Sequence, residues 1–294
     1  GRVLVSARRV NDEIIGQLAP ARFGYGYRDA LARADLDLGG AGGVHVTAFT
    51  TDEAVHIPRD QNDDQAGWKN RAATLMWRRD GTAANSVTLS ASRGVADLPL
   101  LTALGGHMEA TLDRYGVVAE RQWASESITW QAGAELEHHA FRRIASATHD
   151  PVSGEEGYVE CTQTLPCSRA STTLASAFAE MLFSPARSLS LSLGARTMYD
   201  THSRSVHLLP RAAFTWVPDT RNSLTLSAGR FSQPYARDAA GAGVDDGRVG
   251  IAHAAHIELE AVHRRDALLL RAAAFLRQHE CVEPTNVART IPGA

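Results

Sequence analysis

Three residues in the first third of the chain are spaced like the start of a calcium-binding loop. Asp60, Asn62 and Asp64 match the D-x-N-x-D pattern of such loops. The sixth position is Gln65 where a calcium loop needs glycine for its sharp turn, and the twelfth is Arg71 where it needs a bidentate glutamate. The pattern therefore predicts a solvated loop and no metal site.

The other residue types that could do chemistry lack the spacing that chemistry requires. His138 and His139 are adjacent, and successive strand side chains point to opposite faces, so the pair cannot share a metal. His279-Glu280 has no second histidine at zincin spacing, and no G-x-S-x-G elbow occurs. The glycines of 39–43 lack a strand-to-helix context and predict a tight turn. We expect no catalytic, cofactor-binding or metal-binding residues, and a protein that is not an enzyme.

Cysteine usage favours an oxidising compartment over a redox site. Cys161 and Cys167 lie in the longest predicted loop with five residues between them, close enough to close a surface loop by a disulfide. Two unrelated thiols are the alternative. Cys281 begins the last predicted loop and has no assigned partner.

Most of the chain alternates between apolar and polar residues with the period of a β-strand. In 187–199, for example, Leu189, Leu191 and Leu193 alternate with Ser190 and Ser192. The apolar positions are mainly leucine and alanine. The polar positions include residues that we expect to face a watery barrel lumen: Arg33, Asp35, Asp37, Gln131, Glu135, Glu137, His139 and Arg196.

Short and long connections between these strands are expected to alternate strictly along the chain. The predicted short connections are 39–43, 80–85, 124–127, 184–187, 218–222 and 265–266, and the predicted long ones are 10–26, 53–67, 94–106, 144–171 and 232–253. Hairpins that turn tightly at one end and extend far at the other are typical of transmembrane β-barrels.

Aromatic residues near strand ends support the same interpretation. Two stacked sheets would favour bulky, interdigitating side chains on the apolar face, whereas lipid accepts leucine and alanine. Aromatics at strand ends match the interfacial girdles of an outer-membrane barrel. The residues concerned are Trp77, Trp123, Trp130, Phe183, Tyr199 and Trp216.

Composition excludes two other classes. No apolar run approaches the ~18 residues of a membrane helix. A net charge of −3 with scattered arginines argues against a nucleic-acid partner. About thirteen strands can be counted, more than the eight or so that fill a small barrel. The chain starts within a strand, so we expect residues 1–294 to be one partial barrel domain of a longer protein.

Several segments resemble the barrel of TonB-dependent outer-membrane receptors. Their order and spacing over nearly the whole chain carry the resemblance. The segments are RVLVSARR (2–9), DALARADLDL (29–38), VHVTAFTTDE (44–53), WKNRAATLMW (68–77), AGAELEHHAF (132–141), LGARTMYD (193–200), LLPRAAFTWVPD (208–219) and LTLSAGRFSQPYA (224–236).

The resemblance implies an all-β, antiparallel up-and-down transmembrane barrel of about 22 strands around a globular plug. It implies short periplasmic turns, long extracellular loops and a place in the Gram-negative outer membrane. The implied activity is energised uptake of a scarce, bulky nutrient: a metal chelate, a cobalamin-like compound or an oligosaccharide. TonB would act through the plug, which we expect upstream of Gly1, and the closing strands would follow Ala294. No cofactor is implied, and the partners would be lipid, the TonB system and the small-molecule ligand.

Two alternatives remain open at the level of sequence. A passive porin or specific channel would share the alternation but need no plug. A soluble all-β binding protein or adhesin would place the leucines between two stacked sheets.

Overall fold

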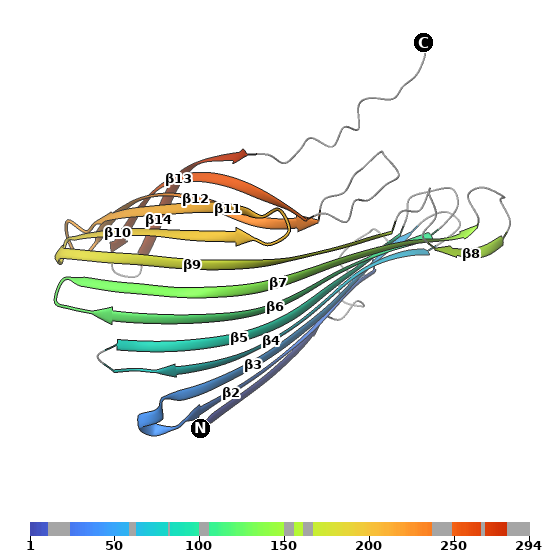
Figure 1. The fold of residues 1–294 in the computed structure, drawn as a ribbon, viewed down its shortest axis with the longest axis horizontal. Helices are drawn as coiled ribbons and strands as arrows, with labels where there is room; N and C mark the ends of the chain where they lie inside the picture. The colour runs from blue at the N-terminus through green and yellow to red at the C-terminus, as the bar shows by residue number, and fades with distance from the viewer. Residues whose placement is uncertain are drawn as a thin grey trace, which may run out of the picture.

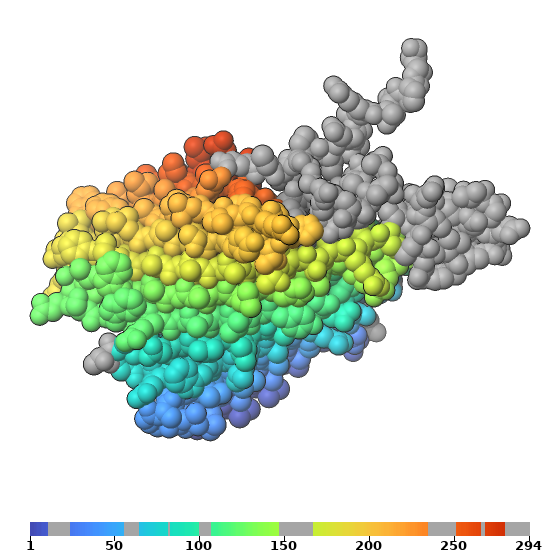
Figure 2. Space-filling view, in the orientation of Figure 1, coloured from blue at the N-terminus to red at the C-terminus, as the bar shows by residue number. Residues whose placement is uncertain are grey.

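The chain forms one twisted antiparallel sheet. The computed structural model describes residues 1–10, 24–58, 63–81, 83–99, 106–149, 156–160, 167–236, 249–265 and 268–280. Figure 1 shows its strands side by side in a curved sheet, and Figure 2 shows them following one another in chain order from blue to red. Within these ranges, no helix is both long enough and apolar enough to cross a membrane.

The strands alternate with turns and longer connections. Their bounds are β1 (Arg2–Val10), β2 (Gly24–Asp37), β3 (Gly43–Pro58), β4 (Asp63–Arg79), β5 (Ala83–Pro99), β6 (Gly106–Ala124), β7 (Ile128–His149), β8 (Glu156–Glu160), β9 (Ser168–Ala186), β10 (Leu189–Asp200), β11 (Ser205–Trp216), β12 (Asn222–Ala236), β13 (Val249–Arg265) and β14 (Leu268–Glu280). One short 3-10 helix, η1 (Gly39–Ala41), lies in the turn between β2 and β3.

The strand order follows the chain, as expected for an up-and-down sheet. It runs from β1 to β7 and then from β9 to β14, and the short β8 lies off this path beside β7. All the strands belong to a single sheet, so the alternative with two stacked sheets is wrong. The predicted all-β, up-and-down class is confirmed.

The register keeps the two faces of the sheet chemically distinct, because directly opposed residues of an antiparallel pair point to the same face. Leu36 opposes Val44, Val44 opposes Trp77, and Trp77 opposes Val87. We call this apolar face the outer face. Leucines along it are open to the surroundings: Leu136 is 49% exposed, Leu193 43% and Leu226 48%.

The opposite face, which we call the inner face, is polar and is partly covered by the last strands. Ser232 Oγ of β12 lies 3.8 Å from Met198 Sδ of β10. The rings of His207 in β11 and His253 in β13 have centroids 4.7 Å apart. The sheet therefore curls toward this face.

The six aromatic residues of the predicted girdle all take outer-face positions. Trp123 opposes Trp130, Phe183 opposes Ile128, and Leu189 opposes Trp216, in each case beside a short turn. The Trp77 indole N–H donates to the Ala41 carbonyl oxygen at 3.0 Å. Tyr199 lies at the other end of its strand, next to Asp200.

Several predicted long loops are shorter than expected, because the strands run on into them. β3 extends to Pro58 and β4 begins at Asp63, within the predicted loop 53–67. β7 extends to His149, and the unexpected β8 lies within the predicted loop 144–171. The apolar alternation stops where outer positions become charged, as at Arg28, which opposes Asp52. The backbone ladder continues past that point, since hydrogen-bonded pairing does not require apolar side chains.

The predicted strict alternation of short and long connections is wrong at residues 201–204, a short turn at the long-loop end of β10 and β11. Asp200 is fully buried and organises this turn. Its carboxylate accepts hydrogen bonds from the Ser203 hydroxyl at 2.6 Å, from the His202 N–H at 3.0 Å and from the Thr172 hydroxyl. Arg204 takes a φ of 54° to close the hairpin.

Candidate functional site: the inner face and the loop end

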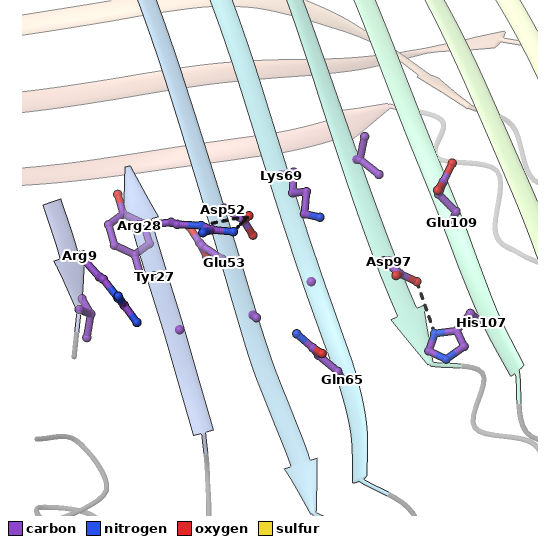
Figure 3. Close-up of a pocket in the computed structure, with 15 residues that line it drawn as sticks. Arg9, Tyr27, Arg28, Asp52, Glu53, Gln65, Lys69, Asp97, His107 and Glu109 are labelled. Carbon is purple, nitrogen blue, oxygen red and sulfur yellow. Dashed lines mark hydrogen bonds and ion pairs between the residues drawn. The ribbon is translucent and has the colours of Figure 1, made fainter. Parts of the chain in front are cut away.

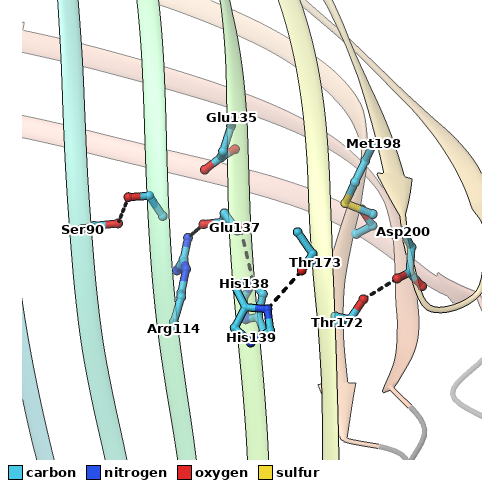
Figure 4. Close-up of polar contacts among 12 residues, drawn as sticks. Ser90, Arg114, Glu135, Glu137, His138, His139, Thr172, Thr173, Met198 and Asp200 are labelled. Atoms are coloured by element: carbon cyan, nitrogen blue, oxygen red, sulfur yellow. Dashed lines mark hydrogen bonds and ion pairs between the residues drawn. The ribbon is translucent and has the colours of Figure 1, made fainter.

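A charged cluster occupies the inner face where β6 and β7 pair. Arg114 opposes His139, and Glu137 lies two residues before His139 on the same face. The Arg114 guanidinium contacts Glu137 Oε1, and His139 Nε2 lies 3.5 Å from Glu137 Oε2 (Figure 4). The Glu137 and His139 side chains are only 14% and 7% exposed, so the carboxylate is held between two nitrogen groups away from bulk water.

A second ion pair joins strands that are not neighbours on the sheet. Arg196 Nη1 of β10 lies 2.9 Å from Glu135 Oε2 of β7, across the intervening β9. The Arg196 guanidinium carbon is 5.1 Å from the centroid of the Phe178 ring, a cation–π distance. Phe178 in turn lies over Gly133: a β-carbon built at that glycine would be 2.5 Å from the ring.

Two further pairs extend the inner face toward the turn end. The Arg211 guanidinium of β11 contacts Glu180 of β9, and the Ser192 hydroxyl donates to Glu180 Oε1 at 2.8 Å. Gln131 donates its side-chain amide to Glu120 Oε1 at 3.2 Å.

The predicted residues of β2 form a separate cluster. Asp35 Oδ1 lies 3.0 Å from Arg33 Nε and 2.6 Å from His45 Nδ1. Asp37 serves the adjacent turn, since its Oδ1 accepts the Gly39 N–H at 2.8 Å.

The two adjacent histidines lie on opposite faces, as the strand period predicts. His139 is buried on the inner face, while His138 lies on the outer face with its Nδ1 3.0 Å from Thr173 Oγ1 (Figure 4). In the described part of the chain, no group of three His, Cys, Asp or Glu side chains could hold a metal ion. Asp60 and Asn62 of the calcium-like pattern lie outside the described residues.

The structure thus places all eight predicted lumen residues on one face but divides them among different contacts. Glu135, Glu137, His139 and Arg196 lie near one another, and Arg33, Asp35, Asp37 and Gln131 lie elsewhere on that face. Whether this face lines a water-filled lumen stays a prediction. Partners that the sequence analysis missed are Arg114, Phe178, Glu180, Arg211, Glu120 and His45. The alternation of side chains in their own strands would have placed these residues on the same face as the predicted ones.

An apolar hollow of about 360 Å³ lies on the inner face near the loop end. Trp68, Leu112 and Phe141 flank it, and the small residues Gly94 and Ala96 form its floor. Asn70 at its side donates to the Thr51 hydroxyl at 3.2 Å. The hollow could accept a flat or branched apolar group.

A second hollow, of about 570 Å³, lies at the loop end on outer-face positions (Figure 3). Arg28 Nη2 lies 2.7 Å from Asp52 Oδ2, and His107 Nδ1 lies 3.4 Å from Asp97 Oδ1. Lys69 also lines this hollow. Its mixed charges suit contact with polar groups.

Cys167 is disulfide-bonded. Cys161 and Cys281 lie outside the described residues, so the predicted pairing of Cys161 with Cys167 stays a prediction.

Comparison with known proteins finds relatives in structure only. No protein-family model matches the chain, and no curated protein matches it in sequence. A variant of the ferric enterobactin receptor PfeA from Pseudomonas aeruginosa superposes with a TM-score of 0.61 at 13% identity, over 88% of this chain and 43% of that one.

Two other solved structures agree. The ferric yersiniabactin uptake receptor FyuA from Yersinia pestis has a TM-score of 0.63 at 7% identity, over 87% of this chain and 46% of that one. The outer membrane transporter YddB from Escherichia coli has a TM-score of 0.59 at 12% identity, over 84% and 39%. This chain therefore spans less than half the length of these three structures. Its fold is that of part of the β-barrel of a TonB-dependent outer-membrane receptor.

Proposed function

We propose that this chain forms part of the wall of an outer-membrane receptor that takes up a metal chelate with energy supplied through TonB. In this proposal the outer face meets lipid, the inner face lines the path of the ligand, and the loop end recognises the ligand outside the cell. The chemistry is binding and gated passage.

The observation that carries the proposal is the chemical difference between the two faces of one sheet. Leucines such as Leu193 and Leu226 remain 43% and 48% exposed on the outer face. Fully burying one leucine side chain is worth about 1.5–3 kcal/mol, so a face lined with them requires an apolar environment. The inner face instead carries compensated charges, such as Glu135 with Arg196, which suit a hydrated interior.

The proposed ligand class follows from two features. PfeA and FyuA are described as receptors for ferric enterobactin and ferric yersiniabactin. On this chain, the inner hollow offers aromatic surface from Trp68 and Phe141. Such aromatic surface suits a metal chelate that carries flat rings.

The proposed partners follow from the proposal that this chain is part of a receptor barrel. We propose that the remaining barrel strands and the plug are supplied by other parts of the protein, and that TonB acts on that plug. Residues 1–294 would then contribute one section of the barrel.

Uptake measurements test the function. The complete protein is expressed in a Gram-negative host with and without TonB, and growth is measured on a panel of ferric chelates as the sole iron source. We expect growth on at least one chelate only when TonB is present. Growth that is independent of TonB, with ion conductance in planar bilayers, would instead indicate a passive channel.

A further inference from the structure

A shallow hollow of about 730 Å³ lies in the outer face over β1 to β6. It follows one cross-strand row of small residues, in which Ala32 opposes Ala48, Ala48 opposes Ala73, and Ala73 opposes Ala91. Val5 and Tyr115 close the two ends of this row. The next row toward the turn end is larger and contains Val46, Leu75 and Leu89, and the change in side-chain size creates the depression.

The row on the loop side of the hollow is charged, and its charges are poorly compensated. Arg71 directly opposes Arg93, an arrangement of like charges that destabilises a strand pair. Arg93 Nε lies 3.7 Å from Asp113 Oδ1, at the far limit of an ion pair. Within the described ranges, Arg71 and Lys69 form no ion pair or hydrogen bond; Lys69 directly opposes Asp52, whose carboxylate pairs with Arg28. The rim thus offers cationic groups that an added anion would bring together.

The position of the rim relative to the apolar rows specifies the kind of anion. The outer-face rows next to the rim on its turn side are apolar, from Ala48, Ala73 and Ala91 to Val44, Trp77 and Val87. Outer positions on the loop side instead include Arg28, Asp52 and Lys69 (Figure 3). The boundary between hydrocarbon and headgroups therefore passes through the row of Arg71 and Arg93. An anion bound there would carry its negative charge at headgroup level, directly above an apolar groove.

We propose that this hollow binds one molecule of a phosphorylated, acylated glycolipid of the lipid A type. Its phosphate would bridge Arg71 and Arg93, with Lys69 nearby, and one acyl chain would lie along Ala48, Ala73 and Ala91. Arginine and lysine form charge-assisted hydrogen bonds with phosphate, and dispersion contacts with the floor would favour a chain over a headgroup alone. The inference rests on the proposed outer-membrane location, since such a lipid occupies the leaflet next to the extracellular loops.

Titration of the purified protein tests the inference. The complete protein is extracted from outer membranes, stripped of lipid by detergent exchange, and titrated with purified phosphorylated lipid A by native mass spectrometry. We expect the double variant Arg71→Gln, Arg93→Gln to lower the affinity about tenfold or more, because charge-assisted hydrogen bonds are lost. Arg121→Gln is the matched control, since Arg121 is on the same face near a turn, opposite Ala132, and should leave the affinity unchanged.

A second variant tests the apolar floor of the site, and a second ligand tests its phosphate contacts. Ala73→Phe fills the floor without touching the arginines and should weaken binding, whereas Ala134→Phe, on the same face outside the hollow, should not. Dephosphorylated lipid A should bind the wild type about as weakly as phosphorylated lipid A binds the double variant. Equal binding of dephosphorylated lipid A, wild-type affinity in the double variant, or equally tight binding of phosphatidylglycerol would overturn the inference.

Each variant is also checked for heat-modifiable migration and for its presence in the outer-membrane fraction. A protein that reaches the outer membrane but does not bind lipid A refutes this inference and leaves the proposed uptake intact. Absence of the wild type from the outer membrane refutes the proposed location itself.

Discussion

At the scale of single residues, the inner face holds its charges by local compensation. Glu137 is contacted by both Arg114 and His139, and Glu135 by Arg196 from two strands away. The Glu135–Arg196 contact ties together β7 and β10, which the backbone ladder does not join directly. If one partner of such an ion pair is removed, the other is left as a poorly hydrated charge. The sheet is therefore stabilised in the arrangement that keeps the pairs together.

Gly133 is the residue on which the Arg196 site depends most closely. A β-carbon there would lie 2.5 Å from the Phe178 ring and 2.6 Å from the Ala119 carbonyl oxygen, so both the ring and the backbone of β6 must move. We expect Gly133→Ala to cost about 1–3 kcal/mol, typical of overpacking, and to separate Arg196 from Phe178. The free energy of unfolding in urea, measured on the refolded complete protein, checks this.

Gly67→Ala serves as the control for that variant. A β-carbon at Gly67 would meet only the Glu53 carbonyl oxygen at 3.5 Å, an ordinary contact. Equal losses of stability in the two variants would show that the Phe178 ring and the β6 backbone accommodate the methyl group.

At the scale of elements, the turns of the sheet depend on a few residues whose backbone or side chain suits no substitute. Gly42 has a φ of 101° and a ψ of −152°, a region that is essentially restricted to glycine. A β-carbon there would also press against the backbone of Arg78 in the neighbouring strand.

We therefore expect Gly42→Ala to destabilise the β2–β3 hairpin by about 1–3 kcal/mol. Gly40→Ala, two residues away, should be nearly neutral, since Gly40 has no atom within 4 Å of the added methyl group. Urea unfolding of both variants gives the comparison. A stable Gly42→Ala protein would mean that the turn can adopt another conformation.

The β11–β12 turn offers a test of pH dependence. Hydrogen bonds from the Asn222 side chain and the Arg221 N–H stabilise the Asp219 carboxylate and lower its pKa below the ordinary value. A lowered folded-state pKa contributes stability above the unfolded pKa of about 3.9, and this stability is lost as the pH falls through the folded pKa.

Asp219→Asn removes this titration and keeps an oxygen acceptor. We expect the melting temperature of the wild type to fall more than that of the variant as the pH decreases below about 4. Parallel curves of melting temperature against pH for the two proteins would indicate that ionisation of Asp219 does not contribute to stability.

The alternation in the sequence was sufficient to predict most of the strands and their facing, because both follow from the side-chain period, and the limits of the alternating segments placed the aromatic residues near strand ends. It was not sufficient for the extensions of β3, β4 and β7, where outer-face leucines give way to residues such as Ala54, Gln65 and Ser146 and the contrast between the two faces weakens. The turn at 201–204 depends on Asp200 and Thr172, which are 28 residues apart. Their contact arises only once β9 and β10 pair. Contacts across three strands, such as Glu135 with Arg196, require the register, which sequence alone did not supply.

At the scale of the whole molecule, the facing of the sheet decides where it can reside. Leu193 lies on the outer face, and the adjacent Ser192 lies on the inner face, where its hydroxyl reaches Glu180 at 2.8 Å. An arginine that faces lipid near the bilayer centre costs about 2–4 kcal/mol, whereas one on the inner face remains hydrated.

We therefore expect Leu193→Arg to reduce the amount of folded protein in the outer membrane severalfold, and Ser192→Arg to reduce it much less. Heat-modifiable migration of the outer-membrane fraction measures both. A larger loss for Ser192→Arg than for Leu193→Arg would reverse the assignment of the faces.

The clustering of indole rings at one end of the sheet has an optical consequence. Trp77, Trp123, Trp130 and Trp216 all lie beside short turns on the outer face, and the chain contains five tryptophans in all. Intrinsic emission therefore arises mainly from a single depth near one bilayer surface. Lipids brominated at successive carbons along their acyl chains should quench this emission most strongly when the bromine lies near the ester groups. The depth of the turn end in the bilayer can therefore be measured on the unlabelled protein.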